Sequence, residues 1–183
     1  MKTFFITLLL LLGVTLQANA QLISADVGVN GLTCSMCARG TEETLKRLDF
    51  IDSIDVDLNT LVAHIIFKKN VNAPIEDIIK AVEDAGFSVR DIKAVYNFTN
   101  QKIGKDEHID YGNDVLHFVG ANDKTLNGPV MLRFIDKQFV SKKEFKDWSK
   151  KTSMTCYKNN KKDDCCPANV TQTKRLFHVT LAS

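Results

Sequence analysis

The chain has 183 residues, of which 44% are hydrophobic and 25% are charged, and 24 basic against 22 acidic residues give a formal net charge of +2. This composition is typical of one folded domain or two small ones, and the near balance of charge excludes the strongly basic surface that nucleic-acid binding requires. Because the five cysteines are an odd number, at least one must be unbridged, bound to a metal or paired with another molecule.

The N-terminal segment, residues 1–20, has the three parts of a secretory signal. Lys2 is the basic tip, residues 4–16 are the apolar core, and Ala18-Asn19-Ala20 is the small-residue cleavage site. The apolar core is shorter than the about 20 residues of a membrane-spanning helix. We therefore expect export, to a bacterial periplasm or by secretion, with the mature chain starting at Gln21 and containing no membrane span.

Residues 21–95 are predicted to form a first domain. Alternating apolar residues predict a strand at 22–30, and apolar residues at helical spacing predict a helix from Cys37 to Leu48. The segments 51–58 and 61–67 alternate on either side of a polar turn and predict a hairpin with His64 on its outer face.

A second helix is predicted to begin at Pro74 and to end at Gly86, which serves as a left-handed cap, before a strand at 87–92. Its buried stripe is expected to consist of Ile75, Ile78, Ile79 and Val82. The resulting order, strand-helix-strand-strand-helix-strand, predicts the ferredoxin-like fold of the α+β class. In this fold one antiparallel four-stranded sheet carries both helices on one face.

Two thiols three residues apart, Cys34 and Cys37, lie where the first strand passes into the first helix. A helix N-terminus favours the thiolate form, and thiolates are ligands for soft ions such as Cu(I). With two strong ligands the site suits an ion of low coordination number better than a structural Zn(II), which needs four. By itself, the spacing also fits a pair of redox-active thiols.

The segments 31–37, 59–63 and 85–87 together resemble the heavy-metal-associated domain of copper chaperones, copper-ATPase metal-binding modules and periplasmic mercuric-ion-binding proteins. The resemblance covers residues 22–95 and implies metal binding by Cys34 and Cys37. It places Leu32 where the family usually has a Met that anchors the loop in the core, and the isosteric replacement is expected to be tolerated.

Two further residues are expected to lie near the metal loop. Phe87 stands where the family places an aromatic residue or Lys close to the loop, and a Phe there would shield the ion from water. Met36 lies between the two cysteines and is expected to be exposed and accessory, with ligation through its thioether as the alternative.

Residues 96–183 are predicted to form a β-rich C-terminal domain with one helix. Strands are expected at 115–119, 130–135, 152–158 and 176–181, turns at 122–123 and 127–129, and an exposed loop at 104–108. Ser141 and Glu144 form a capping box that predicts the start of the helix. If residues 95–103 add a strand, the order matches a small five-stranded barrel of OB type.

The remaining cysteines, Cys156, Cys165 and Cys166, belong to this C-terminal domain. In an oxidising compartment one interpretation is a disulfide from Cys156 to one of the adjacent pair. The other is a second soft-metal site made by the three thiols, with Met154 or His178 as additional ligands. Spacing alone does not decide between them.

The sequence therefore predicts an exported soft-metal-binding protein, in which Cys34 and Cys37 carry or sequester Cu(I). Its partner would be a metal-donating or metal-accepting protein, such as a copper transporter or another heavy-metal-associated domain. The alternatives are Hg(II) detoxification, thiol-disulfide exchange, and metal-dependent control of whatever the C-terminal domain binds, and Zn(II) is a further candidate ion. No hydrolytic motif occurs and the four histidines are scattered along the chain, so we expect no enzymatic activity.

Overall fold

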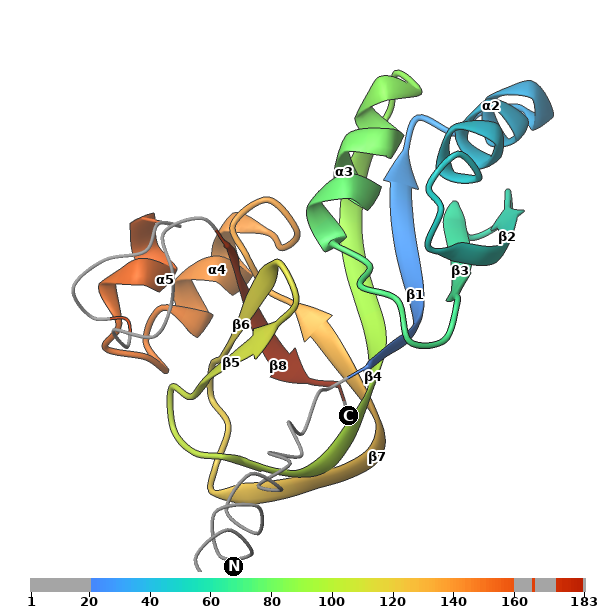
Figure 1. Cartoon of the computed structure of the whole chain (residues 1–183). Coiled ribbons are helices and arrows are strands. Elements are labelled where there is room, and N and C mark those ends of the chain that lie inside the picture. Colours follow the sequence, from blue (N-terminus) through green and yellow to red (C-terminus); the bar gives the residue numbers. More distant parts are fainter. Residues whose placement is uncertain (1–20, 160–165, 167–173, 183) are drawn as a thin grey trace, which may run out of the picture.

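The computed structural model describes residues 21–159, 166 and 174–182, so the signal predicted at 1–20 lies outside the described residues. The described strands form one eight-stranded sheet in the order β2-β3-β1-β4-β7-β8-β6-β5, with helices packed on it (Figure 1). None of the helices in the described part is long and apolar enough to cross a membrane. The strands are β1 Gln21–Asn30, β2 Ile51–Asp57, β3 Val62–Phe67, β4 Ser88–Ile103, β5 His108–Tyr111, β6 Asp114–Phe118, β7 Lys124–Phe134 and β8 Arg175–Leu181, and the helices are α2 Ser35–Leu45, α3 Ile75–Asp84, α4 Lys142–Trp148 and α5 Thr155–Asn159.

The N-terminal part of the sheet confirms the predicted ferredoxin-like arrangement. Strands β2, β3, β1 and β4 are adjacent and antiparallel, with α2 and α3 connecting them in the expected order. The predicted stripe of α3 is buried, and it shares one core with alternate residues of β1 and β3 such as Val27 and Ile65. Gly86 has the left-handed φ of +88° that the predicted helix cap requires.

The two halves of the chain share one strand, because β4 runs without interruption from Ser88 to Ile103. Its residues 88–97 pair with β1 and its residues 93–103 pair with β7, so the two pairings overlap in the middle of the strand. Beyond β7 the sheet continues through β8, β6 and β5, with β6 and β8 parallel. The expected OB-type barrel is therefore not confirmed, since the described strands form an open sheet that ends at β2 and β5.

The C-terminal strands near 115–119 and 176–181 and the helix after Ser141 are confirmed. The Ser141 side chain accepts a hydrogen bond from the Glu144 N–H, as the capping box predicts. The strand predicted at 152–158 is wrong, because this segment contains the short helix α5. Tertiary packing explains the helix: Tyr157 stacks on Phe145 at 4.9 Å between ring centroids and donates a hydrogen bond to the Ile135 carbonyl.

Two other expectations are corrected by the sheet. The turn predicted at 127–129 lies inside β7, where Gly128 takes a φ of +79° opposite an irregular stretch of β4. The loop predicted to be exposed at 104–108 includes two buried side chains, Asp106 and His108. His108 is the first residue of β5, and the pairing of this strand with the sheet buries the end of the polar segment.

The opposite face of the N-terminal sheet is polar. His64 is exposed there, as predicted, and its Nδ1 lies 2.8 Å from Asp26 Oδ1. Asp26 pairs across the strands with Lys93, and Lys93 pairs with Arg133. The Arg133 guanidinium donates hydrogen bonds to both carboxylate oxygens of Glu144, at 2.5 and 3.0 Å. Helix α4 therefore lies on the face opposite α2 and α3.

Asp114 connects the two halves of the protein. Its Oδ2 accepts a hydrogen bond of 2.9 Å from the N–H of Ile75, the first residue of α3. The side chain is 1% exposed, and this burial raises the pKa of Asp114 to about 7, although the Ile75 N–H acts in the opposite direction. At a given pH, the Asp114 carboxyl is thus more often protonated in the folded protein than in the unfolded chain.

We expect Asp114→Asn to alter how stability depends on pH. The pKa rises from 3.8 in the unfolded chain to about 7 in the folded one, so the stabilising effect of the protonated carboxyl is complete below pH 3.8 and is lost as the pH rises through 7. Asn keeps an acceptor for Ile75 without the charge. Urea unfolding between pH 4 and 8 should show the free energy of unfolding of the variant rising relative to that of the wild type as pH rises, by at most about 4 kcal/mol. Parallel profiles for the two proteins would contradict this assignment.

Candidate metal centre

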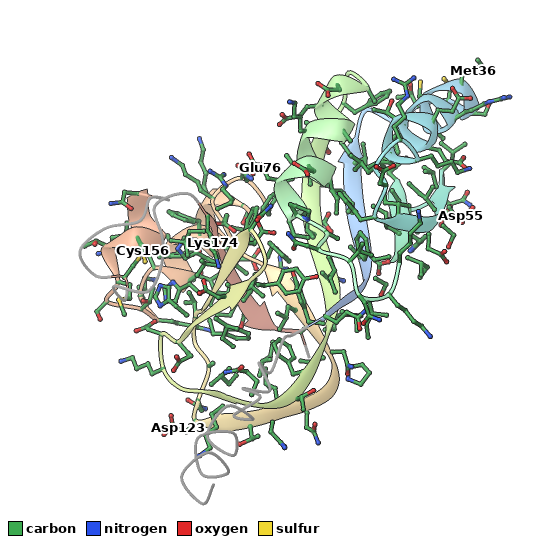
Figure 2. The ribbon with its side chains drawn as sticks, viewed as in Figure 1. Met36, Asp55, Glu76, Asp123, Cys156 and Lys174 are labelled. Carbon is green, nitrogen blue, oxygen red and sulfur yellow. The ribbon has the colours of Figure 1, made fainter. Side chains whose placement is uncertain are left out.

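Cys34 immediately precedes α2 and residues 35–37 form the first turn of that helix, at the end of the molecule where Met36 projects into solvent (Figure 2). Gly31, with a φ of +93°, turns the chain out of the strand. The next residue, Leu32, returns to the core and is 2% exposed. Its burial is what is expected of an apolar residue that anchors the loop.

Cys34 is the N-cap of α2, with φ of −151° and ψ of 161°, and its sulfur accepts a hydrogen bond of 3.3 Å from the Cys37 N–H. The two Sγ atoms are 2.6 Å apart, so both sulfurs point to one position above the first turn. Cys34 is exposed and Cys37 is half-buried. An ion held between them would be within reach of another protein.

The electrostatics of this turn favour thiolate. The pKa of Cys37 is lowered, chiefly by its hydrogen bond with the Cys34 side chain and further by hydrogen bonds from Thr33. The unpaired N–H groups at the start of α2 add a positive field at the same position. Thiolate is the form of cysteine that binds metals.

Both predicted accessory residues lie close to where they were expected. A Cβ placed on Gly31 would stand 3.2 Å from Phe87 Cδ1, so the ring of Phe87 packs directly against the base of the loop. Met36 is 73% exposed, as predicted. Among the described residues, no third His, Cys, Asp or Glu joins the two sulfurs in a cluster suited to a metal.

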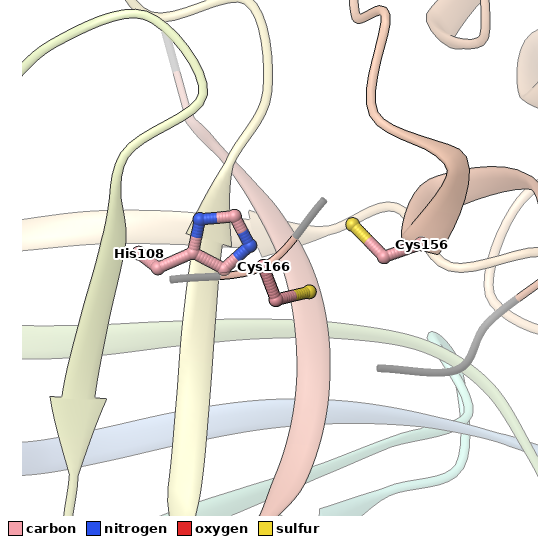
Figure 3. Close-up of side chains that lie close together, drawn as sticks. All are labelled: His108, Cys156 and Cys166. Atoms are coloured by element: carbon pink, nitrogen blue, oxygen red, sulfur yellow. The ribbon is translucent and has the colours of Figure 1, made fainter. Parts of the chain in front are cut away.

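The structure gathers the C-terminal candidates elsewhere. Cys156 is buried in α5, Cys166 is half-buried, and their sulfurs lie together with a ring nitrogen of His108 within 4.8 Å of one another (Figure 3). Cys156 forms a second such group with His117 and His178. Cys165 lies outside the described residues, and Met154 packs at the edge of the cluster around Cys156.

Three of the histidines that are scattered along the chain lie next to one another in the folded protein. His108, His117 and His178 come together on adjacent strands β5, β6 and β8. One signal in the sequence could have pointed to them, because His117 and His178 each interrupt an otherwise apolar run in a strand. Their proximity, however, depends on the parallel pairing of β6 with β8, which the sequence pattern does not reveal.

Residues 26–88 match the family model described as the heavy-metal-associated domain. A copper-transporting ATPase of Helicobacter felis is 35% identical over 66 residues, which are 36% of this chain and 9% of the ATPase. The cation-transporting ATPase HMA5 of Oryza sativa subsp. japonica is 38% identical over 63 residues, which are 34% of this chain and 6% of that protein. The chain thus spans less than a tenth of the length of these two relatives.

Solved structures with similarity to the chain include a copper binding domain from HMA7, a P-type ATPase. It is 33% identical, and the match covers 37% of this chain and 89% of that one with a TM-score of 0.34. The CopZ metallochaperone is 24% identical, with coverage of 36% and 97% and a TM-score of 0.34. These matches account for about a third of the chain.

Proposed function

Because residues 26–88 form a heavy-metal-associated domain, we propose that this protein binds Cu(I) through Cys34 and Cys37 and carries or sequesters it outside the cytoplasm. The observation that carries the proposal is the convergence of the two sulfurs, 2.6 Å apart, at the N-terminus of α2. The predicted signal at residues 1–20 supports the extracytoplasmic location.

The donor set suits Cu(I) for two reasons. Thiolates are soft ligands and Cu(I) is a soft ion that accepts low coordination numbers, whereas a structural Zn(II) site closes four ligands around the ion. The positive field of the helix N-terminus offsets part of the charge of two thiolates. Hg(II) shares the preference for thiolates, so the same site is open to it, and specificity must be measured.

Exposure of the site supports transfer of the ion to a partner. Since Cys34 is exposed and Met36 beside it is 73% exposed, a partner thiolate can approach the bound ion from solvent. The partner forms a new Cu–S bond while one of the original Cu–S bonds breaks, and the copper remains Cu(I) throughout. The partner would be a copper transporter or another heavy-metal-associated domain that presents its own pair of thiols.

Thiol-disulfide exchange is less well supported by the geometry. An attacking cysteine needs both exposure and a stabilised thiolate. The thiol with the lowered pKa, Cys37, is half-buried, which restricts its access to the disulfide of another protein. Carriage of a metal makes use of both sulfurs together and does not require one of them to attack first.

A competition titration tests the proposal. The protein is purified after export, reduced with a non-chelating phosphine, and titrated separately with Cu(I), Hg(II) and Zn(II) against a chelator of known affinity. We expect one exchangeable Cu(I) per chain, which Zn(II) does not displace and which moves to a second heavy-metal-associated domain on mixing. Preference for Zn(II) over Cu(I), or Cu(I) that no thiol partner can remove, would contradict the proposal.

A further inference from the structure

Three histidines form one row on the C-terminal part of the sheet. Strand pairing places His108 opposite His117, and His117 beside His178. The rings of His108 and His117 stack at 4.3 Å with an angle of 3° between their planes, and His178 meets His117 edge to face at 5.2 Å. His117 and His178 are fully buried and His108 is 9% exposed. Three adjacent imidazoles withdrawn from water call for an explanation, since burying polar groups costs free energy.

Each ring has one nitrogen directed at a protein oxygen. His178 Nδ1 lies 2.7 Å from Asp136 Oδ1, and Asp136 is held in turn by the His178 N–H at 3.1 Å. His108 Nδ1 lies 3.1 Å from the Asp106 carbonyl oxygen. His117 Nε2 lies 3.4 Å from Asp106 Oδ1, but neither of these two buried atoms has a hydrogen-bond partner in the described structure.

These oxygens determine which nitrogen carries the proton. An imidazole nitrogen that faces an acceptor bears hydrogen, so the other nitrogen of the neutral ring carries a lone pair. For His108 and His178 that lone pair is on Nε2, and neither Nε2 has a hydrogen-bond partner in the described structure although both are buried. An oriented imidazole whose second nitrogen is left without a partner is the usual state of a metal ligand.

The thiols complete the cluster. His117 Nδ1, the nitrogen that faces away from Asp106, lies 3.8 Å from Cys156 Sγ. The ligand atoms of Cys156, His117 and His178 lie within 4.8 Å of one another, and so do those of Cys156, Cys166 and His108. Figure 3 shows the sulfurs of Cys156 and Cys166 turned toward each other beside the His108 ring. Cys156 belongs to both groups and is the centre of the cluster.

We infer that a second metal site, for one ion of the zinc and copper class, is centred on Cys156 and draws its other ligands from the two groups that Cys156 joins, His108 with Cys166 and His117 with His178. Imidazole nitrogen together with thiolate sulfur is the donor set of borderline ions, while Ca²⁺ and Mg²⁺ require oxygen ligands. The backbone carbonyl of Asp106 orients the His108 ring, and the Asp136 carboxyl group orients the His178 ring.

This second site is separate from the loop of Cys34 and Cys37. Met36 marks that loop at one end of the molecule and Cys156 lies at the other end (Figure 2). Cys34 is exposed, whereas Cys156 is fully buried. An ion at Cys156 is therefore expected to exchange slowly and to stabilise the C-terminal part of the fold.

The test uses the exported full chain carrying Cys34→Ser/Cys37→Ser, so that the first site is silent. After reduction and removal of metals, Zn(II), Cu(I) and the spectroscopic probe Co(II) are added separately. We expect one equivalent bound, a thiolate-to-metal charge-transfer band with Co(II), and a raised unfolding temperature. Comparison of the Zn(II) and Cu(I) affinities identifies the preferred ion.

Three further variants in this background examine the ligands. Cys156→Ser should remove the part of the charge-transfer band that its sulfur contributes. It should also weaken metal binding by at least about 100-fold, a larger loss than removal of a group that only orients a ligand. Asp136→Asn leaves every proposed ligand atom in place and should weaken binding about 10-fold to 100-fold while the band persists. His64→Asn removes an exposed histidine far from the cluster and should change nothing.

Two results would overturn the site. One is a folded Cys34→Ser/Cys37→Ser protein, judged by near-ultraviolet circular dichroism, that binds none of the three ions after reduction. The other is unchanged affinity in Cys156→Ser. If that variant does not fold, X-ray absorption of the Zn(II)-loaded Cys34→Ser/Cys37→Ser protein decides. A zinc ion without a sulfur ligand would also exclude the site. Either failure leaves the proposal for Cys34 and Cys37 intact, since it concerns other residues.

Discussion

Cys34→Ser/Cys37→Ser is expected to abolish the exchangeable Cu(I) equivalent of this protein without unfolding it. The two sulfurs are the only donors that the described structure brings together at the loop, and a serine hydroxyl is a hard, neutral oxygen that Cu(I) binds poorly. The affected side chains are exposed or half-buried, so the free energy of unfolding should change by about 0.5 kcal/mol or less.

Chelator competition and thermal unfolding of the double variant measure these two effects. Met36→Leu is the matched control, since it removes the thioether between the cysteines at a position that is 73% exposed. We expect it to bind Cu(I) as the wild type does, and a large loss of affinity would instead make Met36 a ligand. Retention of the exchangeable Cu(I) equivalent in the double serine variant would refute the central proposal.

Leu32→Ala is expected to lower the free energy of unfolding by about 2–5 kcal/mol, the range for truncation of a buried leucine. Leu32 is 2% exposed and lies two residues before Cys34, so the cavity would open directly beneath the metal loop. The loop would lose the contact that holds its base in the core, and Cu(I) affinity should fall together with stability. Urea unfolding and chelator competition on the same protein measure the two losses.

Leu32→Met is the companion variant, because it keeps the volume and the apolar character of the side chain. Such a replacement should cost less than about 1.5 kcal/mol and leave Cu(I) binding unchanged. If alanine were tolerated as well as methionine, Leu32 would not be the anchor of the loop. If alanine destabilised the fold but left Cu(I) affinity intact, the loop would be held by other contacts, such as Phe87 against Gly31.

Local patterns were sufficient to predict the N-terminal half of the fold. Each element there is marked by its own residues: alternation in the strands, the stripe of α3, and Gly86 where the chain needs a left-handed φ. Because the connections are short, the order of elements leaves few ways to pair the strands. The cysteine loop was predictable for the same reason, since Cys34 and Cys37 are three residues apart and one helix turn brings their sulfurs together.

The C-terminal half depended on contacts between residues distant in the sequence. The segment 152–158 reads locally as a strand, yet stacking of Tyr157 on Phe145 and its hydrogen bond to the Ile135 carbonyl accompany a helix there. The turn expected at Asn127-Gly128-Pro129 became part of β7 because β4 extends far enough to pair with it. In both cases packing against remote elements outweighed the local preference.

The two candidate metal sites differ in the same way. The sequence alone identifies Cys34 and Cys37, because their spacing and the start of a helix already contain the geometry of the site. The cluster around Cys156 arises only when β6 pairs in parallel with β8 and α5 packs across them, which places His108 with Cys166, and His117 with His178, around Cys156. Such pairing is set by burial of the whole sheet, and no local spacing encodes it.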